Sequence, residues 1–196
     1  MSQIAEFHAA ILQNLPELSS EEMQQWIGQN RPSLRSVLAQ ALVGQYLTIT
    51  VDYGETFEQM IVAGRYDWTS DNITAERFPI KGSGTATFET KLFHFNRRIS
   101  SEEAVKLIIS ADPTNPWQVA QIEHELAYGA TYPEEQRQFP IVALGSSCKL
   151  DGIRFVSCLY RDDAERYLCR CYWDVDWDAN CRFLAVRPLS VRPPAD

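Results

Sequence analysis

A histidine near the middle of the chain is the residue best placed for chemistry. The segment Phe93–Arg97 alternates, so His94 and Asn96 are expected to project together, away from Phe93 and Phe95. An aromatic and polar loop without a regular period supplies further candidates, namely Tyr66, Asp67, Trp68 and Asp71. This set predicts a pocket for a polar ligand. The alternative is that the same groups hydrogen-bond to backbone and hold an irregular segment in place.

Catalysis is another use for the same residues. His94 with an acid such as Asp67 or Asp71, or with a cysteine, would suit a small hydrolase or transferase. The other histidines, His8 and His124, fall in predicted helices and are expected at the surface. The Gly145–Cys148 turn has no Gly-x-Ser-x-Gly pattern and no following helix, so no catalytic residue is assigned.

Two patterns suggest a metal ion and then fail on spacing. Asp174–Asp178 mimics the opening of an EF-hand loop, but Ala179 stands where the loop needs glycine and Ala185 where it needs glutamate. The chain has 5 cysteines, and only Cys169 and Cys171 have a spacing near that of zinc ligands. Buried free thiols explain the cysteines better. The sequence predicts no metal and no cofactor, and it has no glycine-rich phosphate loop.

Aromatic residues make up 11% of the chain, and Trp68 and Trp177 fall in predicted turns. Exposed tryptophans often anchor interfaces. The leading interpretation is therefore a binding or protein-interaction module without enzymatic activity, whose partner is another protein or a small polar ligand.

Composition narrows the class of protein. A net charge of −8 and a pI near 4.9 argue against nucleic-acid binding, which depends on Lys and Arg. No stretch approaches the roughly 18 apolar residues that span a bilayer, and no signal peptide opens the chain. With 5 free cysteines expected, the reducing cytoplasm is the predicted compartment.

The spacing of apolar residues predicts three helices in residues 1–46, which form an N-terminal helical unit. This unit would dock on the rest of the chain or serve as a dimerisation arm for a homo-oligomer. Residues 47–188 form the main domain, and residues 189–196 form a proline-rich tail.

The main domain is expected to be α+β, a mostly antiparallel sheet with two to three packed helices. Leu47–Tyr53 alternates as a half-buried strand, and Ser100 with Glu103 forms a capping box that starts a helix. A bulge is predicted near Leu92, and Asp151–Gly152 predicts a hairpin turn. Another helix is expected from Asn115 to Gly129.

Five segments resemble a family of uncharacterised bacterial proteins: Val51–Tyr53, Gly64–Trp68, Phe93–Arg97, Phe139–Gly145 and Arg182–Arg187. The resemblance covers about Thr48 to Arg187. It implies a bacterial soluble protein and supplies no catalytic residue. The order of elements is also weakly similar to the outline of C-type-lectin-like domains, but Trp177–Asp178 is followed by Ala179 without the calcium-site motif of that fold.

Overall fold

The computed structural model describes residues 46–189. Strands make up 40% and helices 22% of them. In chain order the elements are β1 (Leu47–Asp52), α4 (Phe57–Gly64), β2 (Trp68–Thr69), β3 (Thr85–Phe93), β4 (Ile99–Ser100), α5 (Ser101–Ser110), β5 (Gln118–Val119), α6 (Ile122–Thr131), the 3-10 helix η1 (Glu135–Arg137), β6 (Ile141–Leu150), β7 (Ile153–Asp162), β8 (Glu165–Tyr172), β9 (Asp176–Trp177) and β10 (Arg182–Pro188).

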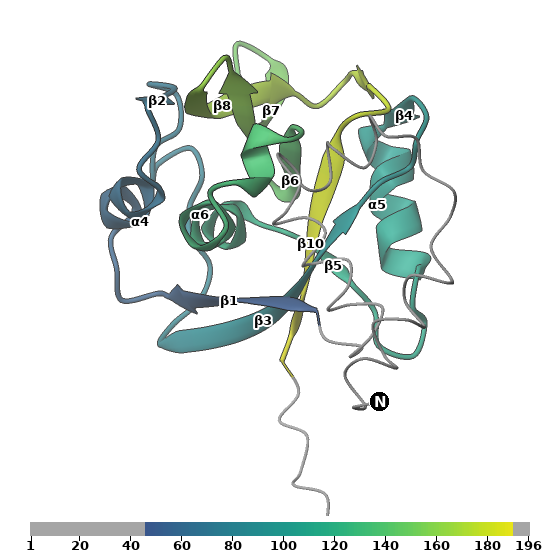
Figure 1. Cartoon of the computed structure of the whole chain (residues 1–196), viewed down its shortest axis with the longest axis horizontal. Coiled ribbons are helices and arrows are strands. Elements are labelled where there is room, and N and C mark those ends of the chain that lie inside the picture. The colour runs from purple at the N-terminus through teal and green to yellow at the C-terminus, as the bar shows by residue number, and fades with distance from the viewer. Residues whose placement is uncertain (1–45, 190–196) are drawn as a thin grey trace, which may run out of the picture.

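An 8-stranded mixed sheet organises the described residues, in the order β1-β3-β10-β6-β7-β8-β2, with β5 paired to β10. The β6–β7 and β7–β8 hairpins are antiparallel, whereas β10 runs parallel to β6 and β2 runs parallel to β8. In Figure 1, β10 runs from top to bottom near the middle, with β1 and β3 at the lower left, β6 beside its upper half, and β7 and β8 at the top. β4 and β9 form a separate two-stranded sheet.

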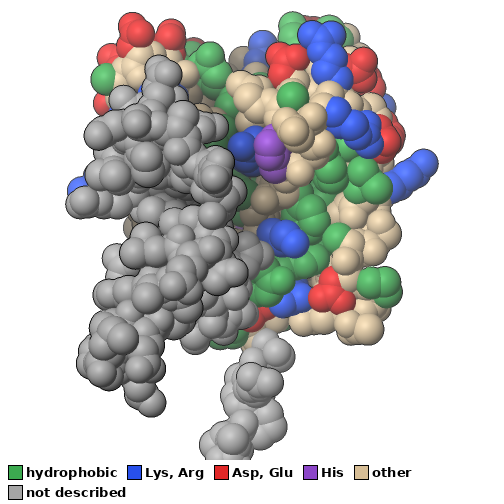
Figure 2. Space-filling view, turned by 45° about the vertical axis from the view of Figure 1, so that its right-hand side comes forward, with side chains coloured by type: hydrophobic (Ala, Val, Ile, Leu, Met, Phe, Trp, Pro, Cys, Tyr) green, Lys and Arg blue, Asp and Glu red, His purple; other side chains and the backbone are tan. Residues whose placement is uncertain are grey.

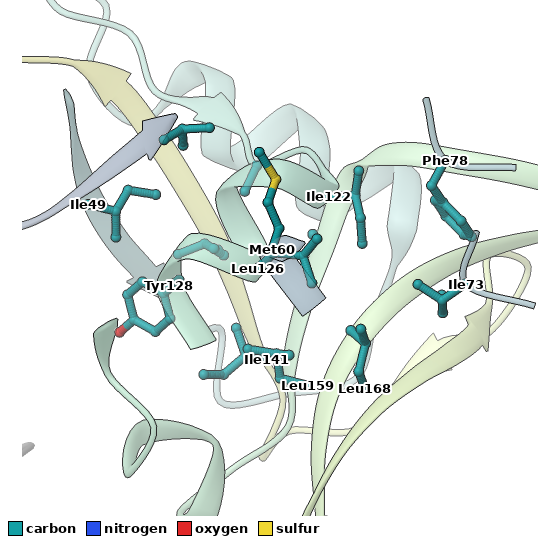
Figure 3. Close-up of a cluster of buried hydrophobic side chains, with 14 of the residues drawn as sticks. Ile49, Met60, Ile73, Phe78, Ile122, Leu126, Tyr128, Ile141, Leu159 and Leu168 are labelled. Atoms are coloured by element: carbon teal, nitrogen blue, oxygen red, sulfur yellow. The ribbon is translucent and has the colours of Figure 1, made fainter. Parts of the chain in front are cut away.

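One face of the sheet packs against α4 and α6. Ile49, Met60, Leu126 and Leu159 belong to this core, and Figure 3 shows their side chains converging around α6. Helix α6 is almost enclosed, because buried residues occupy most of its circumference. A helix in this position would normally be apolar all round. Its polar residues are therefore the unusual feature of this core.

The opposite face packs against α5 and the β4–β9 pair. Ile99, Ala104 and Ile108 contact it from that side, and Trp117 is 1% exposed within it. Helix α5 starts where its sequence predicts, because the Ser100 hydroxyl accepts a hydrogen bond from the Glu103 N–H. The other half of the predicted capping box is not made, since the Glu103 carboxylate accepts hydrogen bonds from Arg97 instead.

The expected fold class, α+β with a helical N-terminal unit and a mostly antiparallel sheet, is wrong. The described chain is mostly sheet, and the sheet is mixed. The last strand pairs with β3, β5 and β6 instead of the preceding β8. Sequence periodicity marks strands, but contacts between residues far apart in the chain decide which strands are neighbours. The helical unit predicted for residues 1–46 lies outside the described residues, apart from Tyr46.

A β-bulge occurs in β6, not near Leu92. The register with β7 shifts between Ala143 and Ser147, whereas β3 pairs with β10 without a shift. The bulge connects to α6: the Gly145 N–H donates to the Ala120 carbonyl at 2.8 Å, and the Ser146 hydroxyl accepts from the Ile122 N–H at 2.9 Å. It therefore fixes the start of the enclosed helix, which begins at Ile122 after the short strand β5, where a continuous helix from Asn115 was expected.

Candidate functional site

Arg166 fixes the ends of several elements at one edge of the sheet. Its guanidinium is buried and donates to the carbonyls of Gly64 and Gly129, both at 2.7 Å, and to the Gln136 side chain at 2.9 Å. The two carbonyls lie at the C-terminal ends of α4 and α6, where a cation is favourable. The Arg166 N–H donates to the Asp67 carboxylate at 2.7 Å. This network places β2 against β8.

Only the first part of β8 is covered by β2. The carbonyls of Arg166 and Leu168 accept hydrogen bonds from the N–H groups of Asp67 and Ser70, and the chain then turns away. Backbone groups on a strand point alternately to its two neighbours, so those of Arg170 and Tyr172 also point away from β7. Within residues 46–189, no strand pairs with this part of β8. It is an open sheet edge.

A hollow of about 370 Å³ adjoins the open edge. The indole of Trp68, which is 49% exposed, and the Cys169 side chain belong to one face of the sheet, next to Tyr167. Arg170 belongs to the other face. The hollow is lined by Trp68, Ser70, Asp71, Asn72, Cys169 and Arg170.

Arg170 is the basic residue that lines the hollow, and Asp71 is the acidic one. The Arg170 guanidinium stacks over the Phe155 ring, 4.4 Å from the centroid, and its Nη1 is buried without a hydrogen-bond partner. A buried donor that lacks a partner destabilises a protein unless a ligand or water satisfies it. Guanidinium groups bind carboxylates particularly well. The hollow therefore offers an aromatic wall, an open strand edge and a donor for a carboxylate.

Two of the predicted loop residues are structural. The Tyr66 ring lies against Gly64 and Gly129, where an added Cβ would come within 2.2 Å of ring or hydroxyl atoms. Asp67 bonds to the Arg166 backbone. Trp68 and Asp71, by contrast, line the hollow. Tyr66 and Asp67 therefore anchor the loop to the rest of the fold, whereas Trp68 and Asp71 line the hollow.

The other three predicted site residues do not line the hollow, namely His94, Asn96 and Trp177. Strand β3 ends at Phe93, and Asn96 has a φ of 50°, so the alternation that would place His94 and Asn96 together stops before them. The exposed His94 ring contacts the Ala179 carbonyl through Nε2 at 2.8 Å. Trp177 is 7% exposed and donates to the Ser101 hydroxyl at 2.9 Å, as a core residue does. Four strands separate β3 from β2, so the predicted residues do not form one site.

Sequence reasoning missed the polar stretch Glu123–Glu125 at the start of α6. All three residues are buried, and His124 is not the surface residue that was expected. Burial lowers the pKa of His124 to about 4, and its Nδ1 accepts from the Gln121 N–H at 3.1 Å. The only signal in the sequence was the run of three polar residues in a predicted helix.

Glu125 is the most deeply buried acid of this stretch. Burial raises its pKa to about 8. Ser157 lies close enough to oppose that shift, but neither side chain makes a hydrogen bond of good geometry. Glu125 is therefore a neutral acid at pH 7.

Glu123 borders a second hollow, of about 180 Å³, between β1, α4 and α6. Burial raises its pKa, and both carboxylate oxygens lack a hydrogen-bond partner. Asp52 and Glu55 line the same hollow. Over residues 46–189, His, Cys, Asp and Glu side chains form no group of three or more that could hold a metal ion.

Comparison of the chain with protein-family models, with curated proteins and with solved structures found no match. Neither resemblance suggested by the sequence is therefore tested. Among residues 46–189, every helix is too short or too polar to cross a lipid bilayer.

Proposed function

We propose that this protein is a binding module of the bacterial cytoplasm that takes up an extended peptide segment of a partner protein along the open edge of β8. The observation that carries the proposal is the pair of outward-facing backbone positions, Arg170 and Tyr172, beside the Trp68 hollow. A peptide that adds a strand satisfies such positions with main-chain hydrogen bonds.

The side chains around the edge indicate which peptide fits. Trp68 and Tyr172 are 49% and 54% exposed, so both offer aromatic surface to a ligand. The Arg170 guanidinium, whose residue lines the hollow, favours a carboxylate, from an Asp or Glu side chain or from the C-terminus of the peptide. The proposed ligand is therefore an extended segment with one carboxylate and an apolar residue nearby.

A library of random short peptides, displayed on phage and selected on the full chain, tests this function. Enriched peptides should carry Asp, Glu or a free C-terminus. Each should lose at least roughly tenfold in affinity for Trp68→Ala, because a buried aromatic anchor contributes more than about 1.4 kcal/mol. Enrichment without a carboxylate preference, or equal binding to Trp68→Ala, would overturn the proposal.

A double-mutant cycle identifies the partner of Arg170. Arg170→Gln and an Asp→Asn change in the selected peptide should each weaken binding, and the two changes together should cost no more than one alone. His94→Gln is the matched control at a distant exposed position. Additive losses would mean that Arg170 does not contact the carboxylate.

Catalysis by His94 with a carboxylate or thiol remains a prediction without support from its contacts. The His94 ring contacts the Ala179 carbonyl, and the ion pair nearby joins Arg98 to Asp178 at 3.3 Å. A general base would need an acid within hydrogen-bond reach.

A further inference from the structure

Three thiols share one face of the β7–β8 hairpin. Cys158 lies directly opposite Cys169 in the antiparallel register, and Cys171 is the next residue along β8 on that face. Directly opposite residues of an antiparallel pair have Cα atoms roughly 4.5–5.5 Å apart, whereas diagonal neighbours are roughly 7–8 Å apart. A disulfide needs a Cα separation of about 4.4–6.8 Å. Cys158 and Cys169 are thus the pair that can be joined with the least backbone movement.

The two opposite cysteines differ in access. Cys169 is partly exposed and lines the Trp68 hollow, whereas Cys158 is 2% exposed in the core. Their side chains interact, and the interaction lowers the pKa of Cys169 while it raises that of Cys158. The thiolate is the reactive form of cysteine. An oxidant that enters the hollow therefore meets the more acidic thiol first.

We propose that Cys169 and Cys158 form a redox-sensitive pair that a hydroperoxide converts into a cross-strand disulfide. The Cys169 thiolate attacks the terminal peroxide oxygen, the O–O bond breaks, and an alcohol or water leaves once the departing oxygen takes up a proton. Cys169 becomes a sulfenic acid. The Cys158 thiol then attacks this sulfur, and the S–O bond breaks with release of water. The two thiols lose two electrons in total, and the peroxide gains them.

The remaining cysteines provide internal controls. Cys148 pairs with Phe155 in the β6–β7 register and packs against the core on the α6 side, away from the pair. Cys181 is 8% exposed outside the hairpin. All 5 cysteines are free in the structure, so oxidation starts from the reduced protein. Oxidation of Cys158 and Cys169 does not require peptide binding at the β8 edge.

The test is peroxide oxidation of the full chain followed by peptide mapping of disulfides by mass spectrometry. We expect one disulfide, Cys158–Cys169, which dithiothreitol reverses. Cys169→Ser should slow thiol loss at least tenfold, whereas the control Cys148→Ser should react as the wild type does. In Cys158→Ser, a sulfenic acid should persist at Cys169 and be trapped by dimedone.

Several outcomes would overturn the pairing. They are a disulfide between other cysteines, a sulfinic acid at Cys169 without any disulfide in the wild type, or unchanged kinetics in Cys169→Ser. If a serine variant unfolds, the rate at which iodoacetamide alkylates each cysteine of the folded wild type still decides the matter. Cys169 must then react at least tenfold faster than Cys158, and equal rates would contradict the proposal.

Discussion

Individual residues of α6 show how far burial sets the chemistry of this protein. Glu125 and His124 are neighbours in sequence, and both are held in their neutral forms because charge is poorly solvated in the core. They respond to pH in opposite directions. The pKa of the acid is raised, whereas the pKa of the base is lowered.

The free energy of unfolding of Glu125→Gln should fall less than that of the wild type as pH rises. The folded protein keeps a proton on Glu125 up to a pKa of about 8, whereas the unfolded chain releases it near 4.5. The unfolded state therefore binds fewer protons in this window, and the free energy of unfolding of the wild type falls as pH rises. Urea unfolding across the window should show that the variant gains a few kcal/mol relative to wild type toward pH 8. If the free energies of unfolding of variant and wild type differed by the same amount at every pH, the raised pKa of Glu125 would be contradicted.

His124→Asn should have the opposite pH profile. The folded-state pKa of about 4 lies below the ordinary 6.5, so protonation of the unfolded chain destabilises the wild type as pH falls between these values. Asparagine can still accept from the Gln121 N–H but does not titrate. Its unfolding free energy should therefore fall less than that of the wild type on acidification. A parallel decline in both proteins would show that His124 is not the titrating group.

At the scale of elements, the β6 bulge and the start of α6 act as one unit. An added Cβ on Gly145 would lie 2.6 Å from the Val119 carbonyl oxygen and 2.7 Å from that of Ala120. Because both atoms belong to backbone, the clash cannot be relieved by rotating a side chain.

Gly145→Ala should therefore lower the free energy of unfolding by about 1–3 kcal/mol, since β5 and β6 must separate. Thermal unfolding measures the loss. Gly54→Ala is a control, because its nearest neighbour is the tip of the Asp52 side chain at 3.1 Å, which can move. Equal melting temperatures for Gly145→Ala and wild type would mean that this close approach is absent.

The sequence predicted the elements whose signals are local. The strand predicted over Leu47–Tyr53, which the structure ends at Asp52, the Ser100 N-cap and the Asp151–Gly152 turn are confirmed. It failed where the signal is not local. The parallel pairing of β10 with β6 and the enclosure of α6 depend on contacts between distant segments, which no short pattern encodes.

The candidate site shows the same division. Trp68 and Asp71 were predicted from their own loop and do line one hollow. Arg170, which lines the same hollow and whose Nη1 makes no hydrogen bond, lies about a hundred residues later and had no distinguishing spacing. Trp177 was expected at a binding surface because it falls in a predicted turn, but the β4–β9 pairing buries it.

At the scale of the whole molecule, the sheet of residues 46–189 separates two buried cores, and it ends at β1 on one side and at β2 with the uncovered part of β8 on the other. The face shown in Figure 2 has hydrophobic side chains interspersed with Lys, Arg, Asp and Glu, including basic groups on a chain whose net charge is −8. Local charge at Arg170, not the net charge, is therefore expected to select the ligand. Binding of an acidic segment should weaken as salt increases.

Replacement of the Tyr172 N–H tests the central claim most directly. Tyr172→Pro removes the outward N–H, whereas Tyr172→Ala removes the same ring but keeps the N–H, and neither change affects a ladder bond to β7. Equilibrium titration of both variants with the selected peptides compares the two. Strand addition at β8 predicts that Tyr172→Pro binds at least roughly tenfold more weakly than Tyr172→Ala. Equal affinities for the two folded variants would contradict it.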